Sequence, residues 1–156
     1  ISAAVGILVD YIAQHDELQQ RLRAHPSLLP EAIDEILRIH APLAANRRVT
    51  TRPVEVGGRQ IGAGERISLN WVGANLDGRV FDDPQAFRLD RDPAANLLYG
   101  AGIHVCPGAP LARLELRVAM EELLARSTQI EPSAQRPPTR AVYPAIGLAT
   151  LALRIR

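Results

Sequence analysis

The chain has 156 residues, of which 47% are hydrophobic and 22% are charged, which is typical of a globular protein with a sizeable core. Its formal net charge is +1, without the large excess of positive charge that is typical of nucleic-acid-binding proteins, so we expect no nucleic-acid partner. A single cysteine excludes an internal disulfide and fits a cytoplasmic location, and no run of about 18 apolar residues is present to predict a membrane span.

The first 40 residues predict three helices. Residues 1–13 and 16–23 have helical patterns, and Pro26 follows the second of them. Residues 30–40 begin with a proline and acidic residues, which are favoured in the first turn of a helix, and their apolar residues share one face.

The middle of the chain predicts short β elements and a long ordered loop. Residues 54–61 predict a hairpin around a Gly-Gly turn, and residues 66–70 alternate polar and apolar side chains as in a half-buried strand. Residues 75–96 are rich in turn-forming residues and predict an ordered loop.

The last part of the chain predicts one long helix and two strands. Apolar residues nearly encircle the helix predicted over 109–126, so we expect it to pack on more than one side. Residues 141–143 and 148–155 can pair as strands. The prediction is a single, mainly α-helical domain with small β hairpins, over residues 1–156. Its four regions are helices (1–40), β-rich segments and ordered loops (41–98), a glycine-rich loop with its following helix (99–126), and a C-terminal loop with strands (127–156).

The run 99–108, Tyr-Gly-Ala-Gly-Ile-His-Val-Cys-Pro-Gly, contains the only cysteine and directly precedes the long predicted helix. The free N–H groups and the dipole at a helix N-terminus lower the pKa of a thiol and stabilise the thiolate, which is the form that binds metal. Gly100, Gly102 and Gly108 remove side chains where a flat ligand would lie against the backbone. Cys106 is therefore a candidate ligand of a soft or redox-active metal.

Other roles for Cys106 fit its surroundings less well. An isolated cysteine is most often a small buried hydrophobic residue. A zinc site needs three or four ligands, which Cys106 and His104 do not supply. A nucleophilic Cys–His pair is disfavoured because catalytic partners usually lie far apart in the sequence.

The run resembles the heme-binding loop of the cytochrome P-450 superfamily, whose pattern is Phe-Gly-x-Gly-x-His-x-Cys-x-Gly. It matches every defined position except the first, where Tyr99 replaces phenylalanine. The resemblance implies that Cys106 is the axial ligand of the iron of heme b and that His104 hydrogen-bonds a heme propionate. It also implies that Tyr99 packs beside the sulfur, where its hydroxyl needs a partner if it is buried. A thiolate ligand donates electron density to iron and favours O–O cleavage, which suits oxygen activation.

Glu35 and Arg38 lie three residues apart in the predicted helix 30–40, so they are neighbours on its surface. An exposed pair of this kind contributes less than about 1 kcal/mol. Together with the run 99–108, however, the pair resembles the Glu-x-x-Arg signature of the same superfamily. In that family the pair is buried behind the heme and joined by a second arginine. Arg91 is the matching position. The resemblance implies a structural triad and not a reaction centre.

Arg47 lies nine residues beyond Arg38, where the family carries an arginine that pairs with a heme propionate. The planar guanidinium group suits this role because it can bind both oxygens of a carboxylate. The adjacent Arg48 is an alternative for the same role, and a solvated arginine is the simpler interpretation without the neighbouring motifs. The resemblance also implies that residues 43–46 and a turn at 144–145 face the substrate.

The resemblance covers residues 18–156, which correspond to the C-terminal, heme-binding part of the cytochrome P-450 fold. The family's acid–Thr pair, which delivers protons to bound dioxygen, is expected just before Ile1. We therefore identify no catalytic residue within the chain and expect the isolated chain to turn over substrate poorly.

The resemblance implies a heme-thiolate monooxygenase, an oxidoreductase that inserts one oxygen atom of dioxygen into a small organic substrate. Its electrons would come from a ferredoxin-like or flavin partner. Arg113 and Arg117 could meet an acidic partner, or be ordinary solvated charges. Two alternatives stay open: a non-catalytic heme-binding module or remnant without the distal half, and an interaction domain whose exposed apolar face drives self-association.

Overall fold

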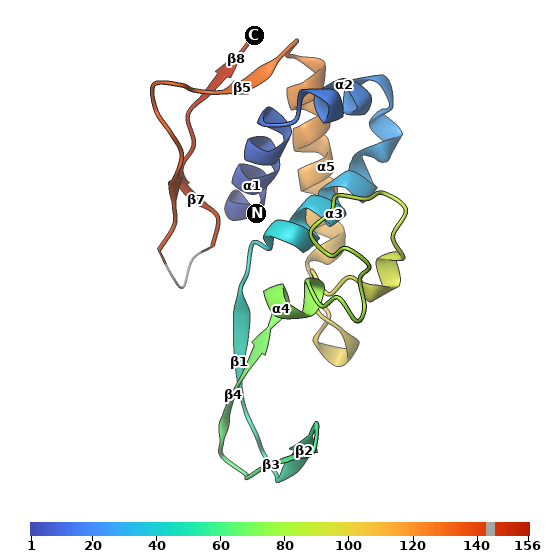
Figure 1. Cartoon of the computed structure of the whole chain (residues 1–156), viewed down its shortest axis with the longest axis vertical. Coiled ribbons are helices and arrows are strands. Elements are labelled where there is room, and N and C mark those ends of the chain that lie inside the picture. The colour runs from blue at the N-terminus through green and yellow to red at the C-terminus, as the bar shows by residue number, and fades with distance from the viewer. Residues whose placement is uncertain (143–145) are drawn as a thin grey trace.

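Four helices pack against one another and contain most of the buried residues. They are α1 (Ser2–Ala13), α2 (Asp16–Ala24), α3 (Leu29–His40) and α5 (Ala109–Ala125). The computed structural model describes residues 1–142 and 146–156, and Figure 1 shows these helices together in one half of the molecule. α1 contacts the other three helices, and α5 also contacts α2 and α3. The helices predicted from the sequence are all present.

Local sequence features explain where these helices begin and end. α2 has acidic residues in its first turn and arginines in its last, which is the arrangement that the helix dipole favours. Pro30 and Pro110 lie in the first turns of α3 and α5, where the missing N–H costs no hydrogen bond. Pro42 disfavours a helical conformation at Ala41, so α3 ends there.

One hydrophobic core joins the four helices to the strand that begins at Ile130. Burying one of these aliphatic side chains stabilises the fold by about 1.5–3 kcal/mol. Core residues that are at most 2% exposed include Leu8, Ile12, Leu22, Leu29, Ile33, Ile36, Leu37, Leu116, Met120 and Ile130.

α5 contributes only one buried stripe to this core. Leu116, Met120 and Leu124, which are spaced four residues apart, face the other helices. Leu111 and Leu114 are 59% and 49% exposed. The expected packing of this helix on more than one side is therefore not seen among the residues that the structure describes.

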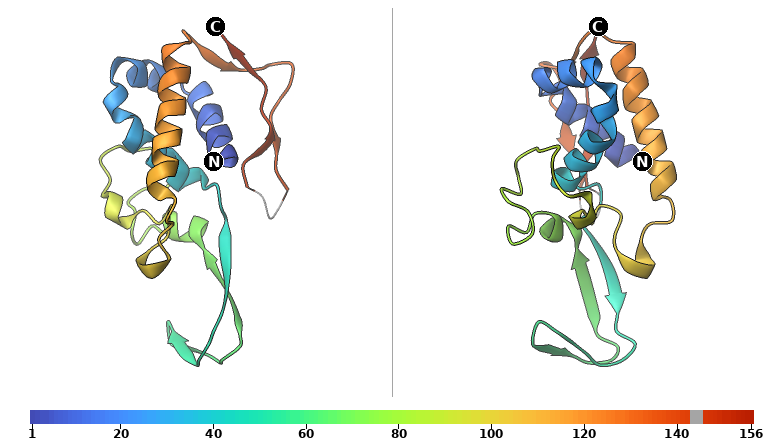
Figure 2. Two further views of the ribbon diagram at one scale, coloured as in Figure 1. Left: turned by 180° about the vertical axis from the view of Figure 1, so that it is seen from behind. Right: turned by 90° about the vertical axis from the view of Figure 1, so that its right-hand side faces the viewer.

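The strands form two-stranded antiparallel sheets. β1 (Ala45–Val49) pairs with β4 (Arg66–Asn70), β2 (Val54–Val56) with β3 (Arg59–Ile61), β5 (Ile130–Pro132) with β8 (Leu153–Ile155), and β6 (Thr139–Arg140) with β7 (Leu148–Thr150). β1 and β4 form a ribbon that projects away from the helices and carries the β2–β3 hairpin at its tip (Figure 2). Gly57 and Gly58 both have positive φ angles, as the tight turn of this hairpin requires.

The predicted hairpin at 54–61 and the predicted strand at 66–70 are both present. β1 was not predicted, because its Asn-Arg-Arg centre lacks the alternation of a half-buried strand. The expected pairing of 141–143 with 148–155 also differs, since β7 and β8 pair with β6 and β5 instead. Residue 143 and the turn expected at 144–145 lie outside the described residues.

The segment between β4 and α5 is mostly loop. It begins with the short helix α4 (Trp71–Asn75), which is capped by Asn70 through a 3.0 Å hydrogen bond from the Gly73 N–H. Residues 76–92 then contain no helix or strand, which agrees with the predicted ordered loop. Among the described helices, none has the length and apolar character needed to cross a bilayer.

Candidate functional site

The buried carboxylate of Glu35 is paired with two arginines. Arg38, one turn further along α3, donates from Nε and Nη2 to the two Glu35 oxygens at 2.7 and 2.9 Å. Arg91, from the loop, donates from Nε to Glu35 Oε1 at 3.0 Å. Glu35 is 5% exposed and Arg38 is 1% exposed. The structure thus brings together the three residues expected to form a structural triad.

The two arginines also bind carbonyl groups of the loop. Arg38 donates to the carbonyls of Asn75 and Pro84, at 2.5 and 2.8 Å. Arg91 donates to three further carbonyls between residues 82 and 86, at 2.7 to 3.1 Å. Because the loop has no regular secondary structure, its carbonyls need such partners. The guanidinium groups therefore hold the loop against α3.

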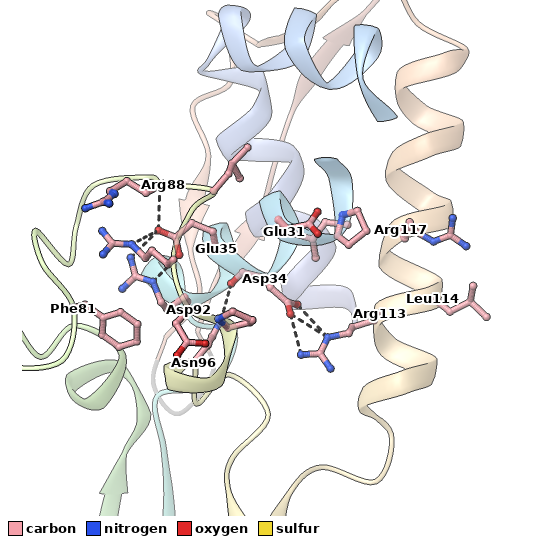
Figure 3. A pocket seen from close by; sticks show the side chains of 16 residues that line it. Glu31, Asp34, Glu35, Phe81, Arg88, Asp92, Asn96, Arg113, Leu114 and Arg117 are labelled. Atoms are coloured by element: carbon pink, nitrogen blue, oxygen red, sulfur yellow. Dashed lines mark hydrogen bonds and ion pairs between the residues drawn. The ribbon is translucent and has the colours of Figure 1, made fainter. Parts of the chain in front are cut away.

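Opposing effects set the pKa of Glu35. Burial alone would raise it, but hydrogen bonds from Arg38, the Arg88 N–H and Arg91, together with the charge of Arg38, hold it below its usual value. The Arg88 N–H lies 3.2 Å from Glu35 Oε1, and Figure 3 shows this contact between the loop and α3. Glu35 is therefore charged at neutral pH, and its charge contributes to stability.

The loop that contains Cys106 is folded back on itself just before α5. The Cys106 N–H donates to the Tyr99 carbonyl at 2.8 Å, and the Cys106 carbonyl accepts from the Ala109 N–H at 3.1 Å. Gly100 has a φ of +80°, and a Cβ there would lie 3.2 Å from the His104 carbonyl oxygen. Glycine at position 100 therefore permits the turn that brings Cys106 to the start of α5, where its side chain is exposed.

An open cavity of about 780 Å³ lies against this loop. Its lining includes most residues predicted to bind a cofactor, namely Tyr99, Gly100, His104, Cys106 and Gly108. Gly102 is not part of the lining, although its φ of +60° helps to shape the loop. In the part of the chain that the structure describes, no three His, Cys, Asp or Glu side chains are grouped to hold a metal ion. A metal at Cys106 would need a cofactor that brings its other ligands.

The opposite wall of the cavity comes from β1 and α4. Asn46, Arg48 and Trp71 line it, whereas Arg47 does not. Successive side chains of a strand point to opposite faces, so the alternation along β1 places Asn46 and Arg48 on the cavity side. Asn46 belongs to the segment 43–46 that was expected to face the substrate. Trp71 was not singled out from the sequence, because the strand pairing that places it was not predicted.

Tyr99 connects the cysteine loop to α3 through an arginine. The Arg113 guanidinium carbon lies 4.5 Å from the centroid of the Tyr99 ring, and Arg113 binds the carboxylate of Asp34 at 2.9 Å. The Tyr99 hydroxyl is buried and has no hydrogen-bond partner among the described residues. Its burial, followed by the charge of Asp34, raises the pKa of Tyr99. Among the described residues, the hydroxyl that distinguishes Tyr99 from the phenylalanine of the cytochrome P-450 pattern is thus unsatisfied.

A second hollow, of about 440 Å³, lies between α3, the loop and α5 (Figure 3). It is lined by the Glu35 cluster, Asp34, Arg113 and Arg117, and contains no cysteine. Arg117 pairs with Glu121 at 3.0 Å, as Arg113 does with Asp34. Of the two arginines considered for an acidic partner, Arg113 is exposed and Arg117 is half-buried, and both are already engaged in ion pairs.

Comparison with known families identifies one match over nearly the whole chain. The family model described as Cytochrome P450 matches residues 8–153. Cyclomarin C epoxidase CymV from Salinispora arenicola (strain CNS-205) is 42% identical over 118 residues, which cover 76% of this chain and 30% of the relative. Beta-dihydromenaquinone-9 omega-hydroxylase from Mycobacterium tuberculosis (strain CDC 1551 / Oshkosh) is 40% identical over 139 residues, covering 89% of this chain and 27% of the relative.

Solved structures show the same similarity in three dimensions. HmtN, a post-tailoring hydroxylase involved in himastatin biosynthesis, has a TM-score of 0.91 and 37% identity over 99% of this chain and 42% of its own. The structure of CYP109E1 from Bacillus megaterium in complex with testosterone has a TM-score of 0.90 and 31% identity, over 97% of this chain and 42% of its own. The chain spans 30% of the length of the epoxidase relative.

We expect Arg91→Ala to lower the free energy of unfolding by about 3–5 kcal/mol, because it leaves the buried Glu35 charge without one partner. Arg88→Ala is the matched control from the same loop, since the Arg88 side chain pairs with Asp90 at the surface. Urea unfolding followed by circular dichroism measures both, and equal effects would contradict a special role for Arg91.

The lowered pKa of Glu35 predicts an acid-sensitive fold. The contribution of the charged Glu35 side chain to stability is present above about pH 4.3, the ordinary pKa of glutamate. It is lost as the pH falls through the lower pKa that Glu35 has in the folded state. Glu35→Gln should be less stable at pH 7 but lose less stability between pH 6 and pH 3 than the unmodified chain. Glu31→Gln, on the exposed side of α3, should keep the pH dependence of stability that the unmodified chain shows.

Tyr99→Phe should raise the free energy of unfolding by about 1 kcal/mol, because it removes a buried hydroxyl that has no partner in the described part of the chain. Thermal and urea unfolding measure this gain. A loss of stability would mean that the hydroxyl makes a favourable contact in solution.

Proposed function

Because this chain belongs to the cytochrome P450 family, we propose that it is the heme-ligating part of a heme-thiolate monooxygenase. The family implies heme, and the hydroxylase and epoxidase names of its relatives support an oxidoreductase in general. The observation that carries the proposal is the cavity that Cys106, Arg48 and His104 line together.

The residues of this cavity fit a flat, partly anionic cofactor. Its volume of about 780 Å³ is within the range of about 300–1,000 Å³ that is usual for small-molecule and cofactor sites. The Cys106 side chain is exposed, and Gly108 places no side chain beside its sulfur, from which a Cβ there would lie 3.8 Å. Leucines from α3, α5 and the loop supply an apolar surface, and Arg48 and His104 supply donors for carboxylates.

We assign the roles of these residues as follows. Cys106 binds the iron, and a thiolate-bound heme supplies oxygen activation by favouring O–O cleavage. Arg48 would bind a heme propionate through its planar guanidinium group, and His104 would donate a hydrogen bond to a propionate. Arg48 is preferred to Arg47 for this role because it lies on the cavity side of β1. The Tyr99 ring packs beside the sulfur ligand.

The substrate and electron donor are proposed only by class. The named relatives act on different organic molecules, so we propose a small organic substrate and dioxygen without naming the substrate. The donor is proposed to be a ferredoxin-like or flavin protein with an acidic surface. Arg113 and Arg117 are the candidate contacts, and such a partner would have to compete with Asp34 and Glu121 for them.

The test is the absorbance spectrum of the chain loaded with hemin, reduced with dithionite and exposed to carbon monoxide. We expect a strongly red-shifted Soret band, which reports a thiolate ligand, and its complete loss in Cys106→Ser. His104→Ala should keep the band but release hemin faster.

Two comparisons sharpen this test. Arg48→Ala should release hemin at least about tenfold faster, as expected for the loss of a hydrogen bond to a charged group, and Arg47→Ala should release it less readily than Arg48→Ala. The opposite order would assign the propionate to Arg47. An unchanged spectrum in Cys106→Ser would overturn the proposed function.

A further inference from the structure

Trp71 and Asn46 form a hydrogen-bonded pair on the wall of the cavity. The indole Nε1 of Trp71 lies 2.6 Å from Oδ1 of Asn46. The backbone N–H of Trp71 also donates to the Ala44 carbonyl at 3.0 Å, which continues the β1–β4 ladder by one residue. Both side chains line the cavity beside Arg48. The ladder therefore holds the pair at the end of the ribbon nearest to the cysteine loop.

The chemistry of the indole determines how the Asn46 amide is oriented. An indole N–H can only donate, so the amide must present its oxygen to Trp71. The amide NH2 group then points away from the indole. Among the residues that the structure describes, it has no hydrogen-bond partner. The pair thus leaves a fixed donor without an acceptor in the part of the chain that the structure describes.

The neighbouring charges favour an anionic acceptor for this donor. Arg48 follows Asn46 by two residues on the same face of β1, so their Cα atoms are about 7 Å apart. Arg48 uses one Nη1 hydrogen bond to the Arg47 carbonyl, at 2.9 Å. The cavity wall formed by β1 and α4 carries no acidic residue, and Glu115, the carboxylate in the lining, belongs to α5.

We propose that Asn46 binds a carboxylate together with Arg48, and that Trp71 is the positioning residue that fixes the Asn46 amide for this purpose. The carboxylate can belong to a porphyrin propionate or to a carboxylic acid that enters the cavity. The porphyrin case rests on the proposed function, whereas the carboxylic acid case does not.

Trp71 is the only tryptophan of the chain, so its fluorescence reports directly on the cavity. The experiment titrates the chain with hemin, with hemin dimethyl ester, whose carboxylates are masked, and with laurate, a carboxylic acid without a porphyrin. We expect hemin to quench Trp71 and to bind at least about tenfold more tightly than the ester.

The variants separate carboxylate binding from a structural role. Asn46→Ala should weaken hemin binding about tenfold and leave ester binding unchanged, and Asn46→Asp should weaken hemin binding further because it adds a negative charge. Trp71→Phe, followed by Soret absorbance, should match Asn46→Ala, and the double variant should show no additional loss. Gln60→Ala, at the tip of the ribbon, is the control for a surface amide and should bind both porphyrins normally.

Each outcome distinguishes the inference from the proposed function. Equal weakening of hemin and ester binding in Asn46→Ala would indicate a structural role and overturn the inference, while the heme proposal stands. If neither porphyrin binds but laurate does so in an Asn46-dependent way, the carboxylate belongs to a small acid and the proposed function fails. If none of the three ligands changes Trp71 fluorescence, both are overturned.

Discussion

The arrangement of this chain depends on the pairing of one buried carboxylate with two arginines. A buried charge is tolerated only when it is paired and hydrogen-bonded, so Glu35 requires both Arg38 and Arg91. The same arginines bind loop carbonyls that have no regular backbone partner. A single cluster therefore compensates the buried charge on α3 and also fixes the course of the loop that leads toward the cysteine run.

α3 also positions the cysteine loop through the residue that precedes Glu35. Asp34 binds Arg113 of α5, and Arg113 lies over the ring of Tyr99 at the start of the loop. Adjacent positions on one helix thus reach two different segments, because they point in directions about 100° apart. The path of the backbone on both sides of the cavity is consequently tied to the same helix.

The cavity is assembled from segments that are distant in the sequence. Cys106 and His104 come from one loop, Arg48 and Asn46 from a strand, and Trp71 from a short helix. This division places the thiol and His104 on one wall and Arg48 and Asn46, which we propose to bind a carboxylate, on another. A flat anionic molecule can therefore be held by its centre and by its edge with groups that do not compete for the same space.

The sequence by itself determined the local features: the run 99–108, the spacing of Glu35 and Arg38, the hairpin at 54–61 and the start of α5. Each depends on residues close together in the chain. Only the tertiary structure decided which residues face the cavity, since the register of β1 with β4 places Arg48 there and pairs Asn46 with Trp71. It also left the Tyr99 hydroxyl without a hydrogen-bond partner within residues 1–142 and 146–156. Such outcomes depend on contacts between distant segments, which local spacing does not encode.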